Sequence, residues 1–157
     1  MMGRALLVVG WLATGGFIVS AGLGYLLSPR ATNITSHVLV GLVASLLFLF
    51  AHCWVMFYLI GTGKAIKDAV AEYELEPELA ERTKVFKNRS YPWLMLAMGL
   101  VIATFVMGGA YLAGATPSWI HELLFYLTLA VQVWTLVIEG QVLMANERLM
   151  NEINSRV

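Results

Sequence analysis

The chain has 157 residues, of which 59% are hydrophobic and only 13% are charged, and its ten basic and ten acidic side chains cancel. A soluble domain carries about 25% charged residues, so this composition excludes an ordinary soluble enzyme and indicates an integral membrane protein. The charged segments mix both signs, which argues against a nucleic-acid partner. The single cysteine excludes an internal disulfide and a cysteine-rich metal site.

Four apolar stretches follow one another, each long enough for a helix of about 20 residues to cross the hydrocarbon core. They are residues 5–27, 37–60, 93–112 and 119–144. The first follows Arg4 as a signal-peptide core would, but it exceeds the usual core length of about 7–15 residues. We therefore interpret it as a retained first span. Because lipid offers the backbone no hydrogen-bond partners, each stretch is expected to be an α-helix.

Short links join the first stretch to the second and the third to the fourth, which predicts two tight helical hairpins. Together they form an antiparallel four-helix bundle, a single all-α transmembrane domain over residues 1–157. Residues 62–91 keep a helical pattern on both sides of a turn at Glu76-Pro77-Glu78, which predicts a helical hairpin outside the membrane. Tyr91-Pro92 is expected to break or kink the helix before the third span.

Lysine and arginine lie almost entirely on one side of these four spans, and Arg30 is the exception. By the positive-inside rule, both termini and residues 62–91 are expected in the cytoplasm, with the spans in contact with the lipid bilayer. The membrane we expect is a bacterial inner membrane.

The ends of the first and third stretches look alike: AGLGYLLSP at residues 21–29 and MGGAYLAGATP at residues 107–117. After each, a histidine opens the next helix, His37 in one case and His121 in the other. This predicts two similar hairpins related by an axis along the membrane normal. Chance similarity is the alternative, because the match is short and rich in common membrane residues.

His37 and His121 open the second and fourth helices, which lie diagonally across such a bundle at its outer side. Two imidazoles that face each other can ligate the iron of a b-type haem. At 100° per residue, His37 shares a stripe with Gly41, Ser45 and His52, and the small Gly41 and Ser45 would leave space for the macrocycle. The alternative for each histidine alone is a structural role at the membrane interface.

The fourth helix carries a polar face, which is expected to point inward or against a partner. Its members are His121, Thr128, Gln132, Thr135 and Glu139.

Gln132 is a candidate cofactor contact, and Thr135 and Glu139 are candidates for a proton or polar path. The structural alternative for Glu139 is a bond to His52 or to a cytoplasmic lysine. For His52 the alternatives are a bond to Gln132 or Thr135, a quinone or proton site, and copper binding together with Met56.

This layout of histidines resembles cytochrome b of the quinol-oxidising complexes, in which two histidines on one helix are opposed by histidines on another. The resemblance implies one bis-histidine haem site at His37 and His121. Thr135 stands where the partner of His52 would be. A second site at His52 would therefore need a ligand from another subunit, as a similarity to succinate dehydrogenase membrane anchors would allow.

The chain shows no hydrolase, transferase or nucleotide motif and no large domain outside the membrane. We expect a small subunit of a respiratory or other electron-transfer complex that binds haem b, a quinone or both, and that is not catalytic alone. One alternative is a cofactor-free structural or assembly subunit of a membrane complex. The other is a small transporter or channel lined by Gln132, Thr135 and Glu139.

Overall fold

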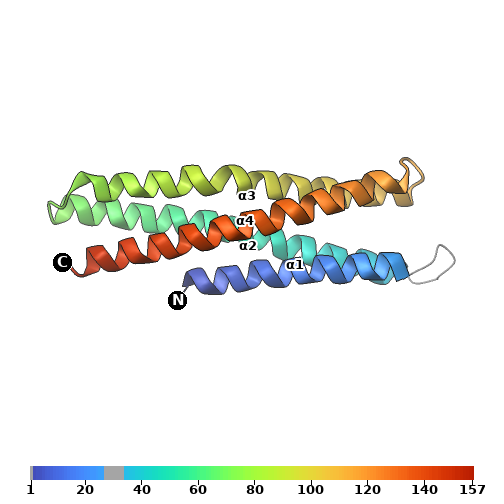
Figure 1. Cartoon of the computed structure of the whole chain (residues 1–157), viewed down its shortest axis with the longest axis horizontal. Coiled ribbons are helices and arrows are strands. Elements are labelled where there is room, and N and C mark those ends of the chain that lie inside the picture. The colour runs from blue at the N-terminus through green and yellow to red at the C-terminus, as the bar shows by residue number, and fades with distance from the viewer. Residues whose placement is uncertain (1, 27–33) are drawn as a thin grey trace.

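The computed structural model describes residues 2–26 and 34–157, and over these residues the protein consists of four α-helices (Figure 1). They are α1 (Met2–Leu26), α2 (Ile34–Glu72), α3 (Pro77–Leu112) and α4 (Ser118–Asn154). All four are long and apolar enough to cross a membrane. The prediction of an all-helical membrane protein with four spans is therefore confirmed. The link between the first two helices lies largely outside the described residues.

Figure 1 shows the helices lying lengthwise beside one another. The turn between α2 and α3 lies at the same end as the C-terminus, and the turn between α3 and α4 lies at the other end. We call these the α2–α3 end and the α3–α4 end. The main contacts are those of α1 with α2 and of α3 with α4, and further contacts join α2 to α3 and α1 to α4. Side chains of all four helices can therefore meet in one interior.

The helices α2, α3 and α4 continue beyond the start of α1 at the α2–α3 end, where they form a three-helix extension (Figure 1). Its core consists of Ile66, Leu79, Leu149 and Ile153. The helix α3 begins directly at Pro77, after Glu76 in an extended conformation. Proline is well suited to the first helical position because its missing N–H would have no partner there.

Of the break or kink that Tyr91-Pro92 predicts, the break is absent, because α3 runs without interruption through Pro92. The flanking residues are held by other helices. Leu94 is fully buried, and the Tyr91 hydroxyl donates a hydrogen bond to the Met56 carbonyl of α2 at 3.1 Å. Such packing allows a membrane helix to continue through a proline, despite a local cost of about 3 kcal/mol.

A network of ion pairs holds the α2–α3 end together. Arg156 pairs with Glu152 and with Glu76, and Glu152 also pairs with Arg82 of α3. These side chains are between one third and two thirds exposed, so water and salt weaken the attraction.

We expect Glu152→Gln to lower the free energy of unfolding by less than about 1 kcal/mol, because exposed ion pairs contribute little. Thermal unfolding in detergent at low and high salt measures the effect, which should shrink as salt is added. Glu81→Gln, which removes a single pair with Lys84, is the matched control. A loss of several kcal/mol, or one independent of salt, would contradict the interpretation.

The interior alternates between apolar and polar layers. One apolar cluster, nearer the α2–α3 end, consists of Leu6, Val55, Leu59, Leu94, Ile138, Val142 and Leu143. The second, nearer the α3–α4 end, consists of Ala13, Phe17, Ala44, Phe48, Ala97 and Val101. Five buried polar side chains lie in the same stretch of the bundle: Thr14, His52, Gln132, Thr135 and Glu139. Burying so many polar groups requires hydrogen bonds inside the protein.

Candidate functional site

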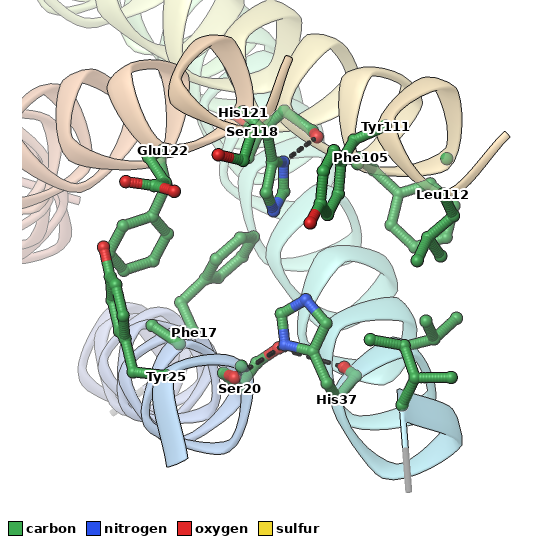
Figure 2. Close-up of a pocket in the computed structure, with 18 residues that line it drawn as sticks. Phe17, Ser20, Tyr25, His37, Phe105, Tyr111, Leu112, Ser118, His121 and Glu122 are labelled. Carbon is green, nitrogen blue, oxygen red and sulfur yellow. Dashed lines mark hydrogen bonds between the residues drawn. The ribbon is translucent and has the colours of Figure 1, made fainter. Parts of the chain in front are cut away.

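A pocket of about 290 Å³ lies near the α3–α4 end and is lined by residues of all four helices. This volume is at the lower end of the range for small-molecule sites, about 300–1,000 Å³. Figure 2 shows His37 of α2 and His121 of α4 pointing toward each other across it. Phe17, Phe105 and Phe125 contribute to walls that are mostly apolar.

Both histidines are oriented by a backbone carbonyl of the preceding helix. Nδ1 of His37 lies 2.7 Å from the Ser20 carbonyl oxygen, and Nδ1 of His121 lies 2.9 Å from the Thr104 carbonyl oxygen. A carbonyl oxygen can only accept, so each Nδ1 carries a proton and donates it. In a neutral imidazole this leaves Nε2 as the nitrogen with a free lone pair. Neither Nε2 has a hydrogen-bond partner among residues 2–26 and 34–157.

The distance between the two imidazoles suits a single ion held between them. Their ring centroids are 6.2 Å apart and their planes are nearly perpendicular, at 82°. A metal–imidazole bond is about 2 Å long and the nitrogen lies about 1 Å from the ring centroid, so two rings on one ion have centroids about 6 Å apart. The observed distance between the two ring centroids therefore matches that of two imidazoles that bind one metal.

A glycine lies against each imidazole. A Cβ on Gly24 of α1 would be 3.0 Å from His37 Nδ1, and a Cβ on Gly108 of α3 would be 2.9 Å from His121 Cε1. Any larger residue would displace the ring. The two halves of the site are built alike, because the carbonyl that orients each histidine lies 17 residues before it in both cases.

The set of donors fits haem iron better than a bare ion. Zinc needs four ligands, and no group of three or more His, Cys, Asp or Glu side chains within the described residues could hold a metal ion. The porphyrin of a haem supplies four nitrogens itself, so its iron needs only two axial ligands from the protein. Two opposed imidazoles with free Nε2 atoms meet this need.

A second polar site surrounds His52, about 22 Å from His37 along α2. Nδ1 of His52 lies 2.8 Å from Glu139 Oε1, and its Nε2 lies 2.8 Å from Gln132 Oε1. The Gln132 amide in turn donates to the Thr14 hydroxyl of α1 at 3.2 Å. His52 is 0% exposed and Glu139 is 2% exposed. Both nitrogens of His52 therefore form hydrogen bonds, whereas in His37 and His121 only Nδ1 forms one among the described residues.

The other residues singled out from the sequence lie apart from the pocket. Gly41 faces Ser20, whose hydroxyl would be 3.0 Å from a Cβ there, and Ser45 donates to the Gly41 carbonyl at 2.7 Å. Thr135 donates to the Val131 carbonyl of its own helix at 2.7 Å. The polar face of α4 points inward over Thr128, Gln132, Thr135 and Glu139, all of which are buried.

Four residues of the histidine site escaped the sequence analysis: Ser20, Gly24, Thr104 and Gly108. Two of them act through backbone carbonyls, which any residue type could provide. The glycines could have been found by counting back from the histidines, because Gly24 and Gly108 each lie 13 residues before their histidine.

Comparison of the chain with protein families, with curated proteins and with solved structures finds no match in any of the three.

Proposed function

We propose that the protein is a small membrane subunit of an electron-transfer complex and that it holds a b-type haem between His37 and His121. The observation that carries the proposal is the pair of free Nε2 atoms on rings whose centroids are 6.2 Å apart. When bound, the haem supplies a one-electron carrier. Because His37 and His121 would both hold the group, neither histidine would be left to act on a substrate, which fits electron transfer better than catalysis by this chain alone.

The residues around the histidines have defined tasks in this proposal. The carbonyls of Ser20 and Thr104 accept from the two Nδ1 atoms, which orients each ring and makes its Nε2 a stronger ligand. Gly24 and Gly108 let the rings lie close to their neighbouring helices. Phe17, Phe105 and Phe125 shield the pocket from water and so influence the reduction potential of what it binds.

The equivalence of the two half-sites supports an antiparallel bundle made of two similar hairpins, one with His37 and the other with His121. The same elements recur in the same order and at the same spacing, from the orienting carbonyl through the glycine to the histidine. Such a pair of repeats would be related by an axis along the membrane normal.

We further propose that both termini and the three-helix extension lie in the cytoplasm, in a bacterial inner membrane. Support comes from the lysines and arginines of the extension, including Lys64, Lys87 and Arg148, since positive charge favours the cytoplasmic side. The haem pocket would then lie near the outer surface, and the extension offers a cytoplasmic surface to another subunit of the complex.

The test is a reduced-minus-oxidised absorption spectrum of the protein purified in detergent. We expect a haem b α-band in the wild type that is lost in His37→Ala and in His121→Ala, because each removes one axial ligand. Ser45→Ala, on α2 but outside the pocket, is the control that should keep the band. A wild-type protein that is folded, colourless and free of iron would contradict the haem site and favour a cofactor-free structural subunit.

A quinone is the second candidate occupant of the pocket. The favourable observation is an apolar, aromatic wall with polar groups at its rim, where the Tyr25 hydroxyl lies 2.8 Å from that of Tyr126. Solvent extraction of the purified protein and identification of the extracted lipids would detect it. A colourless protein that retains quinone in stoichiometric amount would favour this occupant.

The third alternative, a transporter or channel, has less support. Its expected lining residues Gln132, Thr135 and Glu139 are buried, and each forms a hydrogen bond inside the protein. Ion flux through liposomes that contain the purified protein would be the observation in its favour.

A further inference from the structure

The hydrogen bonds around His52 have a direction that follows from the number of hydrogens available. The Thr14 hydroxyl has one hydrogen, which it donates to the Gly10 carbonyl at 2.9 Å. It must therefore accept from Gln132, which turns the amide NH₂ of Gln132 toward Thr14 and its carbonyl oxygen toward His52. An amide oxygen can only accept, so Nε2 of His52 carries a proton.

One further proton lies between His52 and Glu139. Nδ1 and Oε1 are 2.8 Å apart, and a hydrogen bond of this length needs a proton on one of the two atoms. Whether the imidazole or the carboxyl group holds it, the pair as a whole is neutral. This neutrality is what permits the pair to lie in the bundle interior, where an uncompensated charge is costly.

The surroundings provide this pair with no other charged partner among the described residues. From α1 it receives only the hydroxyl of Thr14, through Gln132. On α2, Phe48 packs edge-on against His52, with ring centroids 4.6 Å apart. The ionisable side chain that α3 brings to this region is Tyr91, whose hydroxyl is bonded to the Met56 carbonyl. A change of charge on the pair would therefore change the electrostatic potential inside the bundle, because no neighbouring charge in the described part of the chain compensates it.

We propose that His52 and Glu139 form a proton-binding site whose affinity for one further proton rises when an electron enters the site between His37 and His121. This proposal rests on the haem site proposed above. One electron from a donor such as a quinol adds one negative charge about 22 Å from the pair, and this charge favours the transfer of one proton from water to the pair. The product is an imidazolium beside a neutral carboxyl group, and no bond other than that to the proton is formed.

The route for the proton points to the α2–α3 end. Asn146 lies two helical turns beyond Glu139 on the same face of α4. Its Oδ1 lies 3.3 Å from the hydroxyl of Thr62 of α2, whose single hydrogen is shared with the Tyr58 carbonyl at 2.9 Å. Its amide nitrogen is buried without a hydrogen-bond partner in the part of the chain that the structure describes. Asn146 and Thr62 therefore provide buried or half-buried polar groups between Glu139 and the three-helix extension.

The test is the pH dependence of the midpoint potential of the haem-loaded protein. Because reduction favours the protonated pair, the potential should rise as pH falls, with uptake of a fraction of one proton per electron, since the two sites are about 22 Å apart. Glu139→Gln keeps a hydrogen-bonding group beside His52 but removes the ionisable group, and it should abolish the dependence. Thr135→Val, a buried and nearly isosteric change on the same helix, should leave it intact.

A second readout does not need the haem. Infrared titration of the haem-free protein should show a protonation change of the pair that is missing in Glu139→Gln. If no haem binds but this change is seen, the proposed function fails while the proton-binding pair stands. If haem binds and the wild-type potential does not vary with pH, the coupling is overturned. If the potential loses its pH dependence in Glu122→Gln but keeps it in Glu139→Gln, the coupling is also overturned, because Glu122 lines the haem pocket.

Discussion

Gly108→Val is expected to lower the affinity for haem at least a hundredfold, equivalent to about 2.7 kcal/mol or more, while the four helices stay folded. A Cβ at this position would lie 2.9 Å from Cε1 and 3.1 Å from Nδ1 of His121. Contacts this short cannot be accommodated, so the ring must move and its Nε2 leaves the axis toward His37. Titration of the purified protein with haem, followed by absorption, measures the affinity.

Gly99→Val is the matched control, because a Cβ on Gly99 of the same helix meets nothing within 4 Å. It adds the same side chain to α3 and should leave the affinity for haem close to that of the wild type. Circular dichroism of both variants checks that the helices are intact. Equal haem binding by the two variants would show that the ring of His121 is not held in the position on which the haem site depends.

Glu139→Leu is expected to lower the free energy of unfolding by about 3–5 kcal/mol, the cost of removing one member of a buried pair. Nδ1 of His52 would then lose its partner at a position that is 0% exposed. Unfolding in mixed detergents, followed by circular dichroism, provides the measurement. Glu139→Gln should cost much less, since its amide can still bond to His52.

The double variant His52→Leu/Glu139→Leu tests why Glu139→Leu is destabilising. It distinguishes the cost of leaving His52 without a hydrogen-bond partner from the cost of altered helix packing. Because buried ionisable pairs can often be replaced together by apolar residues, the double variant should be more stable than Glu139→Leu alone. Such non-additivity is expected of residues in direct contact. A double variant less stable than either single variant would show that the pair itself contributes most of the stability.

The helices were predictable from the sequence, whereas their lengths and continuity were less so. Long apolar runs reveal where the chain crosses the membrane, because lipid demands helical backbone there. Outside the membrane the helical pattern of residues 62–91 still indicated a helix, and packing around Ile66 and Leu149 stabilises this part of α2, which ends at Glu72. At Pro92 the local preference pointed to a break, and contacts with α2 outweighed it.

The candidate site was predictable only in part, because sequence periodicity describes one helix at a time. His37 and His121 could be paired from their equivalent places at the starts of two helices. Space beside them was expected from Gly41 and Ser45 on the same stripe, yet the glycines against the rings are Gly24 and Gly108, on neighbouring helices. Which residues face each other across an interface depends on the rotation of each helix about its axis, which no single stripe determines.

The bond from Ser20 to His37 joins α1 to α2, and the bond from Thr104 to His121 joins α3 to α4. Each histidine is thus oriented by a hydrogen bond within its own helix pair, and this bond does not involve the other pair. Each pair can therefore prepare its ligand as it enters the membrane, before the two pairs meet. A ligand that bridges the histidines binds only the assembled protein, so it stabilises assembly by mass action. The occupant of the pocket would then stabilise the contact between the two helix pairs.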